Sequence, residues 1–210
     1  MHTEWSAECG VEDPLLLVPW SDADGVVAFV DLQNDPGAIE SIFEAEAHPP
    51  LMQALRALNA MRSPVFTAKC DAWEMNEEEL THLRLELGFT LEPTLEDTEE
   101  FAVGEPEEVA FGFASYIDCI CRDQALFASF PRHQHLVRSI TRLAAPLNLL
   151  NTALECVLRP AFVHLQAPRQ GYAVSVYVKA LDRSPQRAWT RWAAALAEVT
   201  ALLRRGDTFR

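Results

Sequence analysis

Two cysteines and two histidines have residue types and a spacing that suggest a metal site. Cys119 and Cys121 lie two residues apart, and so do His133 and His135. On a β-strand, residues two apart share a face, so both thiolates could bind one ion. However, the other residues of that face are apolar, side chains two apart on a helix diverge, and the usual zinc spacings are absent. The sequence therefore predicts buried structural thiols, no metal site and no cofactor.

A second pattern places a charged residue directly before four of the five cysteines, at Glu8, Lys69, Asp118 and Glu155. Because side chains alternate along a strand, cysteines that pack against helices would leave these charges together on the opposite face. Aromatic residues and further charges, including Tyr177 and Lys179, fall on the same side. The binding residues that this pattern predicts are Glu8, Lys69, Asp71, Trp73, Tyr116, Asp118, Glu155 and Arg159.

A sheet face of this kind has several possible roles. It can be a solvated outer surface, a site for a small polar ligand, or a homodimer interface sealed by ion pairs. The aromatic residues among the charges favour a covered face over a solvated one. We therefore predict a non-enzymatic binding or interaction module that self-associates, with a small polar ligand or another protein as further possible partners. A purely structural protein, whose acidic segment docks on a basic partner, is a separate hypothesis.

Two other segments suggest an enzyme. Residues 27–35 read Val-Ala-Phe-Val-Asp-Leu-Gln-Asn-Asp, and residues 64–71 read Pro-Val-Phe-Thr-Ala-Lys-Cys-Asp. They resemble the opening strand, helix and second strand of isochorismatase-like cysteine hydrolases, although neither lysine of the chain falls where that family places its own. The resemblance implies that Asp31 takes the proton of a nucleophilic cysteine, for which Cys156 is a candidate. It also implies a parallel, doubly wound sheet, so strand direction separates this alternative from the binding module.

Alternating apolar and polar residues predict the strands that carry these side chains. Period-two patterns cover residues 4–9, 64–73, 111–122 and 153–159, and β-rich runs cover 26–31 and 172–181. Most of these segments have one apolar and one mixed face. This pattern is typical of an antiparallel sheet with helices on one side.

Helix signals lie between the strands. Four helices are expected to begin at serine or proline signals, at Asp35-Pro36, Pro49-Pro50, Ser129 with Pro131, and Ser184-Pro185. Asn76 followed three residues later by Glu79 resembles a capping box, which predicts a further short helix ending near Gly88.

The order of these elements predicts the fold. From residue 25 it is strand, helix, strand, an acidic excursion, strand, helix and strand, which is the βαββαβ order of ferredoxin-like sheets. We therefore predict one α+β domain over residues 1–210, with an extra N-terminal strand and a C-terminal strand plus helix. The excursion, at about residues 74–109, has thirteen acids against the single base Arg84 and is predicted to be mobile.

The charge balance argues against nucleic-acid and membrane partners. The net charge is −14, and only residues 123–210 are basic, with twelve bases against five acids. Proteins that bind phosphates concentrate Lys and Arg in a basic domain, so we expect no nucleic-acid partner. No run of about eighteen apolar residues occurs, so we expect no membrane partner. The first residues do not resemble a secretory signal, and the five cysteines are an odd number, so we expect a soluble cytoplasmic protein with reduced thiols.

Overall fold

The computed structural model describes residues 1–88, 110–206 and 208. Within them the chain forms an α+β fold around a six-stranded sheet. The strands are β1 (His2–Ala7), β2 (Leu16–Val18), β3 (Val65–Glu74), β4 (Phe111–Cys121), β5 (Thr152–Val163) and β6 (Arg169–Asp182). The helices are η1 (Pro36–Ser41), α1 (Phe43–Ala47), α2 (Pro49–Asn59), α3 (Glu77–Leu87), α4 (Gln124–Phe127), α5 (Phe130–Ala144) and α6 (Pro185–Arg204).

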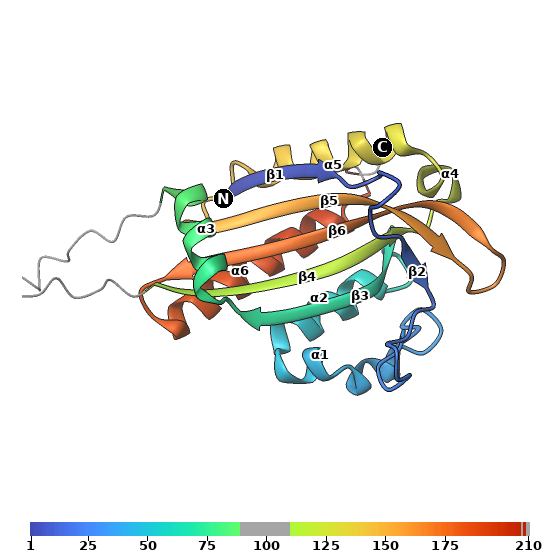
Figure 1. The fold of residues 1–210 in the computed structure, drawn as a ribbon, viewed down its shortest axis with the longest axis horizontal. Helices are drawn as coiled ribbons and strands as arrows, with labels where there is room; N and C mark the ends of the chain where they lie inside the picture. The colour runs from blue at the N-terminus through green and yellow to red at the C-terminus, as the bar shows by residue number, and fades with distance from the viewer. Residues whose placement is uncertain (89–109, 207, 209–210) are drawn as a thin grey trace, which may run out of the picture.

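The strand order across the sheet is β1-β5-β6-β4-β3 (Figure 1). The four strands from β5 to β3 pair antiparallel with their neighbours. β1 and β2 both pair parallel with β5, with β1 beside residues 153–158 and β2 beside residues 161–163. The sheet is therefore mixed, and its outer strands on the β5 side come from the N-terminal part of the chain.

This topology does not confirm the ferredoxin-like core, and the predicted antiparallel sheet is confirmed only in part, because β1 and β2 pair parallel with β5. The predicted strand at residues 26–31 is an irregular loop with one isolated bridge, between Ser21 and Ala28. Phe29, Val30 and Leu32 instead pack against the hydrophobic core from this loop. Val26 and Val27 remain exposed, so only the second half of the run is partly buried.

Side-chain caps begin α3, α5 and α6 where the sequence predicts these helices. The Ser129 and Ser184 hydroxyls accept hydrogen bonds from backbone N–H groups in the first turns of α5 and α6. Asn76 and Glu79 form the expected reciprocal capping box of α3, and Gly88 ends that helix at a φ of 57°. A left-handed residue is easiest for glycine, which explains the sharp end of α3.

The helices α2, α5 and α6 lie behind the sheet in Figure 1 and cover one of its faces. Ile117 and Val176 are buried on this side, together with the fully buried Trp192 of α6. The Trp192 indole N–H donates to the Ser115 hydroxyl at 2.9 Å, which joins α6 to β4. Burying each large apolar side chain contributes about 1.5–3 kcal/mol, so this layer holds the sheet in place.

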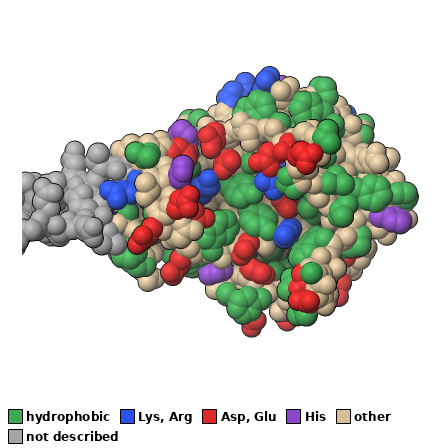
Figure 2. Space-filling view, viewed as in Figure 1, with side chains coloured by type: hydrophobic (Ala, Val, Ile, Leu, Met, Phe, Trp, Pro, Cys, Tyr) green, Lys and Arg blue, Asp and Glu red, His purple; other side chains and the backbone are tan. Residues whose placement is uncertain are grey.

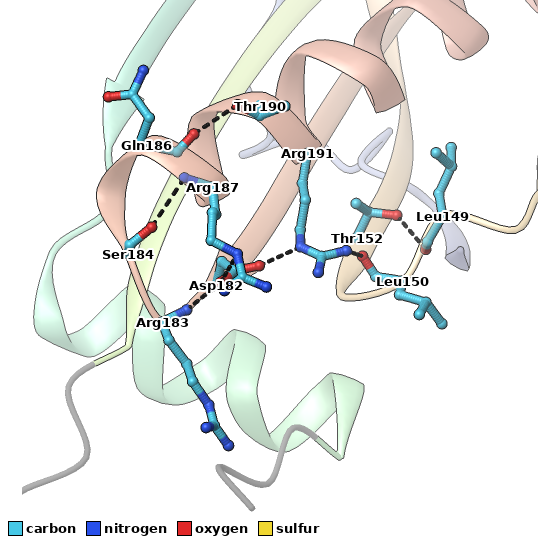
Figure 3. A network of polar contacts seen from close by, with 10 residues as sticks. All are labelled: Leu149, Leu150, Thr152, Asp182, Arg183, Ser184, Gln186, Arg187, Thr190 and Arg191. Atoms are coloured by element: carbon cyan, nitrogen blue, oxygen red, sulfur yellow. Dashed lines mark hydrogen bonds and ion pairs between the residues drawn. The ribbon is translucent and has the colours of Figure 1, made fainter. Parts of the chain in front are cut away.

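A polar network fixes the start of α6 at the end of β6 (Figure 3). The buried Asp182 carboxylate accepts the backbone N–H of Arg183 at 2.7 Å and pairs with the guanidinium groups of Arg187 and Arg191. Arg191 also donates to the Leu150 carbonyl at 3.3 Å. The network therefore ties together the end of β6, the first turns of α6 and the turn before β5.

The acidic excursion is in part regular structure. Residues 74–88 are the end of β3 and α3, and Leu83 of α3 packs against Ala153 and Leu181. The rest of the excursion, 89–109, lies outside the described residues, so its mobility stays a prediction. No helix in the described part of the chain is long and apolar enough to cross a membrane.

Candidate binding surface

The cross-strand register brings the charged residues that precede the cysteines onto the sheet face opposite α2, α5 and α6. Asp71, Tyr116, Tyr177 and Glu155 form one row across β3, β4, β6 and β5. Lys69 and Asp118 are cross-strand neighbours in the next row. We call the following set the mixed-charge face: Glu8, Lys69, Asp71, Trp73, Tyr116, Asp118, Glu155, Arg159, Tyr177 and Lys179. Figure 2, which views this side, shows acidic, basic and hydrophobic side chains interspersed over the sheet.

Three aromatic rings run across the middle of the mixed-charge face. The centroids of Trp73 and Tyr116 are 6.3 Å apart in an edge-to-face arrangement, and those of Tyr116 and Tyr177 are 5.6 Å apart. All three side chains are half-buried. The Trp73 indole N–H donates to a Glu79 carboxylate oxygen of α3 at 3.0 Å. Each ring contact contributes roughly 0.5–1.5 kcal/mol, so the three rings stabilise one another as a half-buried aromatic row.

Two of the cations on this face are already paired with acids of the same chain. The Lys179 ammonium lies 2.7 Å from a Glu155 carboxylate oxygen, and the Arg159 guanidinium lies 2.9 Å from Glu8. Arg159 also donates to the Tyr177 hydroxyl at 3.4 Å. The side chains of Lys179 and Glu155 are only 22% and 25% exposed, so their contact is partly shielded from water.

Lys69 and Asp71 differ from these pairs, because neither has an ion-pair partner within 4.0 Å among the described residues. Lys69 is exposed, and its ammonium lies 5.2 Å from the centroid of the Trp20 ring. Asp71 accepts the backbone N–H of Ala72 at 2.7 Å. One positive and one negative side chain beside the aromatic row are thus available to a partner.

Asp118 is the most buried carboxyl of the face, at 4% exposure. It accepts a hydrogen bond from the Ser175 hydroxyl at 2.5 Å. Burial raises the pKa of Asp118, whereas the Ser175 hydrogen bond and the charges of Arg159 and Lys69 act in the opposite direction. Burial also raises the pKa of Tyr116, and Asp118 and Asp71 raise it further. Burial therefore disfavours the charged form of both groups, so neither acts as a strong ionic anchor.

Neighbouring segments border the mixed-charge face at both ends. At one end α3 packs over the sheet through Leu83 (Figure 1). Near the other end the loop after β2 contributes Trp20, whose indole N–H donates to the Ala68 carbonyl at 2.7 Å. A pocket lined by Met75, Phe111 and Trp189, among others, includes none of the ten residues of the face.

The cysteines do not have the features of a nucleophile. Cys119, Cys121 and Cys156 are buried on the helix-covered side, and burial raises the pKa of Cys156 to about 12. A reactive thiol needs a lowered pKa and access to solvent. Cys70 is half-buried, but Cys9 is exposed, so the prediction of a buried thiol is wrong there. Cys9 lies beyond the end of β1, outside the strands and helices of the fold.

The residues of the hydrolase hypothesis are not assembled as in an active site. Asp31 lies in a turn rather than at a strand end, and its carboxylate accepts the backbone N–H of Gln33 at 3.1 Å and the Asn34 amide at 2.6 Å. Four strands of the sheet are antiparallel, whereas the hypothesis requires a parallel sheet. The geometry therefore gives this alternative no support.

The residues considered for a metal site are separated. Cys119 and Cys121 face the helices, His133 is buried in the first turn of α5, and His135 is exposed. Burial lowers the pKa of His133, and its Nδ1 lies 3.2 Å from the Ser129 carbonyl oxygen. A different group converges within the described residues, namely His2, Glu4 and Glu86. The predicted strand begins at residue 4, so the sequence does not place His2 beside Glu4, and nothing in it shows that α3 brings Glu86 to them.

The chain matches no protein-family model, and no curated protein or solved structure is significantly similar to it.

Proposed function

We propose that this chain is a non-enzymatic binding module that self-associates through the mixed-charge face. The proposal rests on Lys69 and Asp71, which lie beside the aromatic row of Trp73, Tyr116 and Tyr177. Neither has an ion-pair partner within 4.0 Å in the described part of the chain. A half-buried aromatic strip provides apolar area for an interface, and unpaired charges of both signs provide its specificity.

A two-fold dimer would satisfy these charges. In such an interface the same surface meets itself, so a contact from residue i to residue j occurs twice. Lys69 and Asp71 lie two positions apart on β3, which places their Cα atoms roughly 6.6 Å apart on one face. Lys69 of each copy could then pair with Asp71 of the other copy, on either side of the two-fold axis.

The charges of the mixed-charge face also limit the classes of ligand that could bind to it. Four of its charged residues are acids and three are bases, in a chain with a net charge of −14. This balance disfavours a polyphosphate or nucleic-acid ligand and fits a partner that carries both signs. We include a cytoplasmic location in the proposal, because free cysteines are typical of a reducing compartment.

Sedimentation velocity over a range of protein concentrations tests this proposal. We expect the wild-type chain to form dimers and Lys69→Asp to weaken dimerisation by roughly tenfold or more, because two pairs of acids would then oppose each other. Arg142→Asp is the matched control, since Arg142 is an exposed residue of α5, on the covered side of the sheet.

Three outcomes would count against the proposal. A wild-type chain that stays monomeric at high concentration would leave the face to a small ligand or a different protein. If Lys69→Asp and Arg142→Asp weaken dimerisation equally, the change in net charge is responsible rather than the mixed-charge face. Undiminished dimerisation of Lys69→Asp would place the interface elsewhere.

A further inference from the structure

Three potential metal ligands from two distant parts of the chain converge beside the mixed-charge face. His2 and Glu4 lie two residues apart on β1 and therefore point to the same side of the sheet. Glu86, in the last turn of α3, reaches them across the end of the sheet. One ligand atom from each of the three side chains lies within 4.8 Å of the other two.

The separation of two of these atoms fits a tetrahedral metal ion. His2 Nε2 lies 3.3 Å from Glu86 Oε1. Zinc binds nitrogen and oxygen at about 2.0–2.2 Å, so neighbouring ligand atoms in a tetrahedral site are roughly 3.3–3.5 Å apart. The His2–Glu86 pair already has this spacing. The exposed Glu4 side chain needs only to rotate to complete a site with three protein ligands.

The local charges also favour a cation. The Glu86 side chain is only 25% exposed, and its carboxylate lies within 4.8 Å of a Glu4 carboxylate oxygen. Two carboxylates are thus close together in a partly desolvated place. Lys179 is held by Glu155 at 2.7 Å, so its charge is already shared with another acid.

We propose that His2, Glu4 and Glu86 bind one divalent transition-metal ion of the zinc class. The imidazole nitrogen favours zinc or cobalt over magnesium and calcium, which prefer oxygen ligands alone. Three protein ligands leave a fourth position for water or for a group from a partner. The ion would also fasten α3 to the edge strand β1, and this inference does not depend on whether the face forms a dimer.

Titration of the metal-free chain with zinc in a calorimeter, and with cobalt in an absorption spectrometer, tests the site. Cys9→Ser is the background for all variants, because Cys9 is an exposed thiol that could bind metal by itself. We expect one ion per chain, cobalt bands without a thiolate charge-transfer band, and a zinc-dependent rise in melting temperature.

The variants His2→Ala and Glu86→Gln should each weaken zinc binding on the order of tenfold or more, since each removes one of three ligands. The matched controls are His135→Ala on α5 and Glu198→Gln on α6, which change exposed residues of the same types on the covered side of the sheet. These controls should bind zinc as the background does.

The proposal is overturned by any of three results. The first is the absence of saturable zinc binding in the Cys9→Ser background. The second is equal affinity in the background, His2→Ala and Glu86→Gln, with all of them folded by circular dichroism. The third is magnesium binding as tight as zinc binding, because this would indicate attraction to acidic residues in general rather than coordination by the imidazole.

Discussion

Two buried aspartates, Asp118 and Asp182, differ in their effect on folding stability because their surroundings differ. Asp182 is paired with Arg187 and Arg191, whereas Asp118 has one hydroxyl donor, Ser175, and no ion-pair partner within 4.0 Å in the described part of the chain. Burial raises the pKa of Asp118, so the folded state holds its proton more tightly than the unfolded state does. The charge of Asp118 therefore opposes folding, while that of Asp182 is compensated.

Replacing each carboxylate by its amide should separate these two cases. We expect Asp118→Asn to be at least as stable as the wild type near neutral pH, because the amide oxygen still accepts from Ser175 without a charge to desolvate. Asp182→Asn should lose about 1–3 kcal/mol, a range kept low because Arg187 is largely exposed. Urea unfolding midpoints provide the comparison.

The pH dependence of folding stability tests whether the charge of Asp118 opposes folding. A raised folded-state pKa makes stability fall as the pH rises from the ordinary value of 3.8 through the folded value. Asp118→Asn should flatten this decline, which begins near the ordinary pKa of 3.8. An unchanged pH profile, or a large loss of stability in Asp118→Asn, would show that the carboxylate is a favourable ionic anchor.

The thiols provide a second test at the scale of single residues. Cys9 is exposed, whereas Cys119, Cys121 and Cys156 are buried and burial raises their pKa values. A thiol reagent should therefore modify Cys9 of the native protein first and the buried thiols only upon unfolding. Mass spectrometry of the labelled peptides identifies the order, and early modification of Cys156 would revive the nucleophile hypothesis.

Among the elements, α3 has a special position because it borders the mixed-charge face. Glu79 accepts the indole N–H of Trp73 and the backbone N–H of Asn76, so one side chain joins the aromatic row to the helix cap. We expect Glu79→Ala to lose about 1–2 kcal/mol, more than a typical exposed substitution. Glu78→Ala, one position earlier in the same turn, is the control, and equal unfolding midpoints for both variants would contradict this role.

The elements also show what a sequence can and cannot predict. Alternation and caps identified β1, β3, β4, β5, β6 and the five helices η1, α2, α3, α5 and α6, because these signals are local. The three residues of β2 are too short to show a period, and the parallel pairing of β1 with β5 depends on contacts more than 140 residues apart. Residues 26–31 have strand-like composition but pack as a loop.

For the candidate sites, too, local features were predictable from the sequence and contacts between distant segments were not. The face on which Lys69, Asp118 and Glu155 lie was predictable, because side-chain parity is a local property. The partners of these residues were not, since the Lys179–Glu155 contact depends on the register of β5 against β6. Glu86 beside His2 depends on how α3 docks, which no local pattern specifies.

At the scale of the whole molecule, the proposed self-association depends on the mixed-charge face. Helices cover one side of the sheet, and the other side carries an aromatic row and two internal ion pairs. It also carries Lys69 and Asp71, which have no ion-pair partner among residues 1–88, 110–206 and 208. A protein that exposed such a face to water alone would gain little from its aromatic residues. Contact between two copies would bury the rings and pair the remaining charges.

The most direct test mixes two variants that should not dimerise alone. Lys69→Asp presents only acids at this position of the interface, and Asp71→Lys presents only bases, so each should be monomeric in sedimentation velocity. Mixed in equal amounts, with one copy carrying a fluorescent label, they should form a heterodimer, because each acid then meets a base. A mixture that stays monomeric at concentrations where the wild type dimerises would contradict pairing of Lys69 with Asp71 across the mixed-charge face.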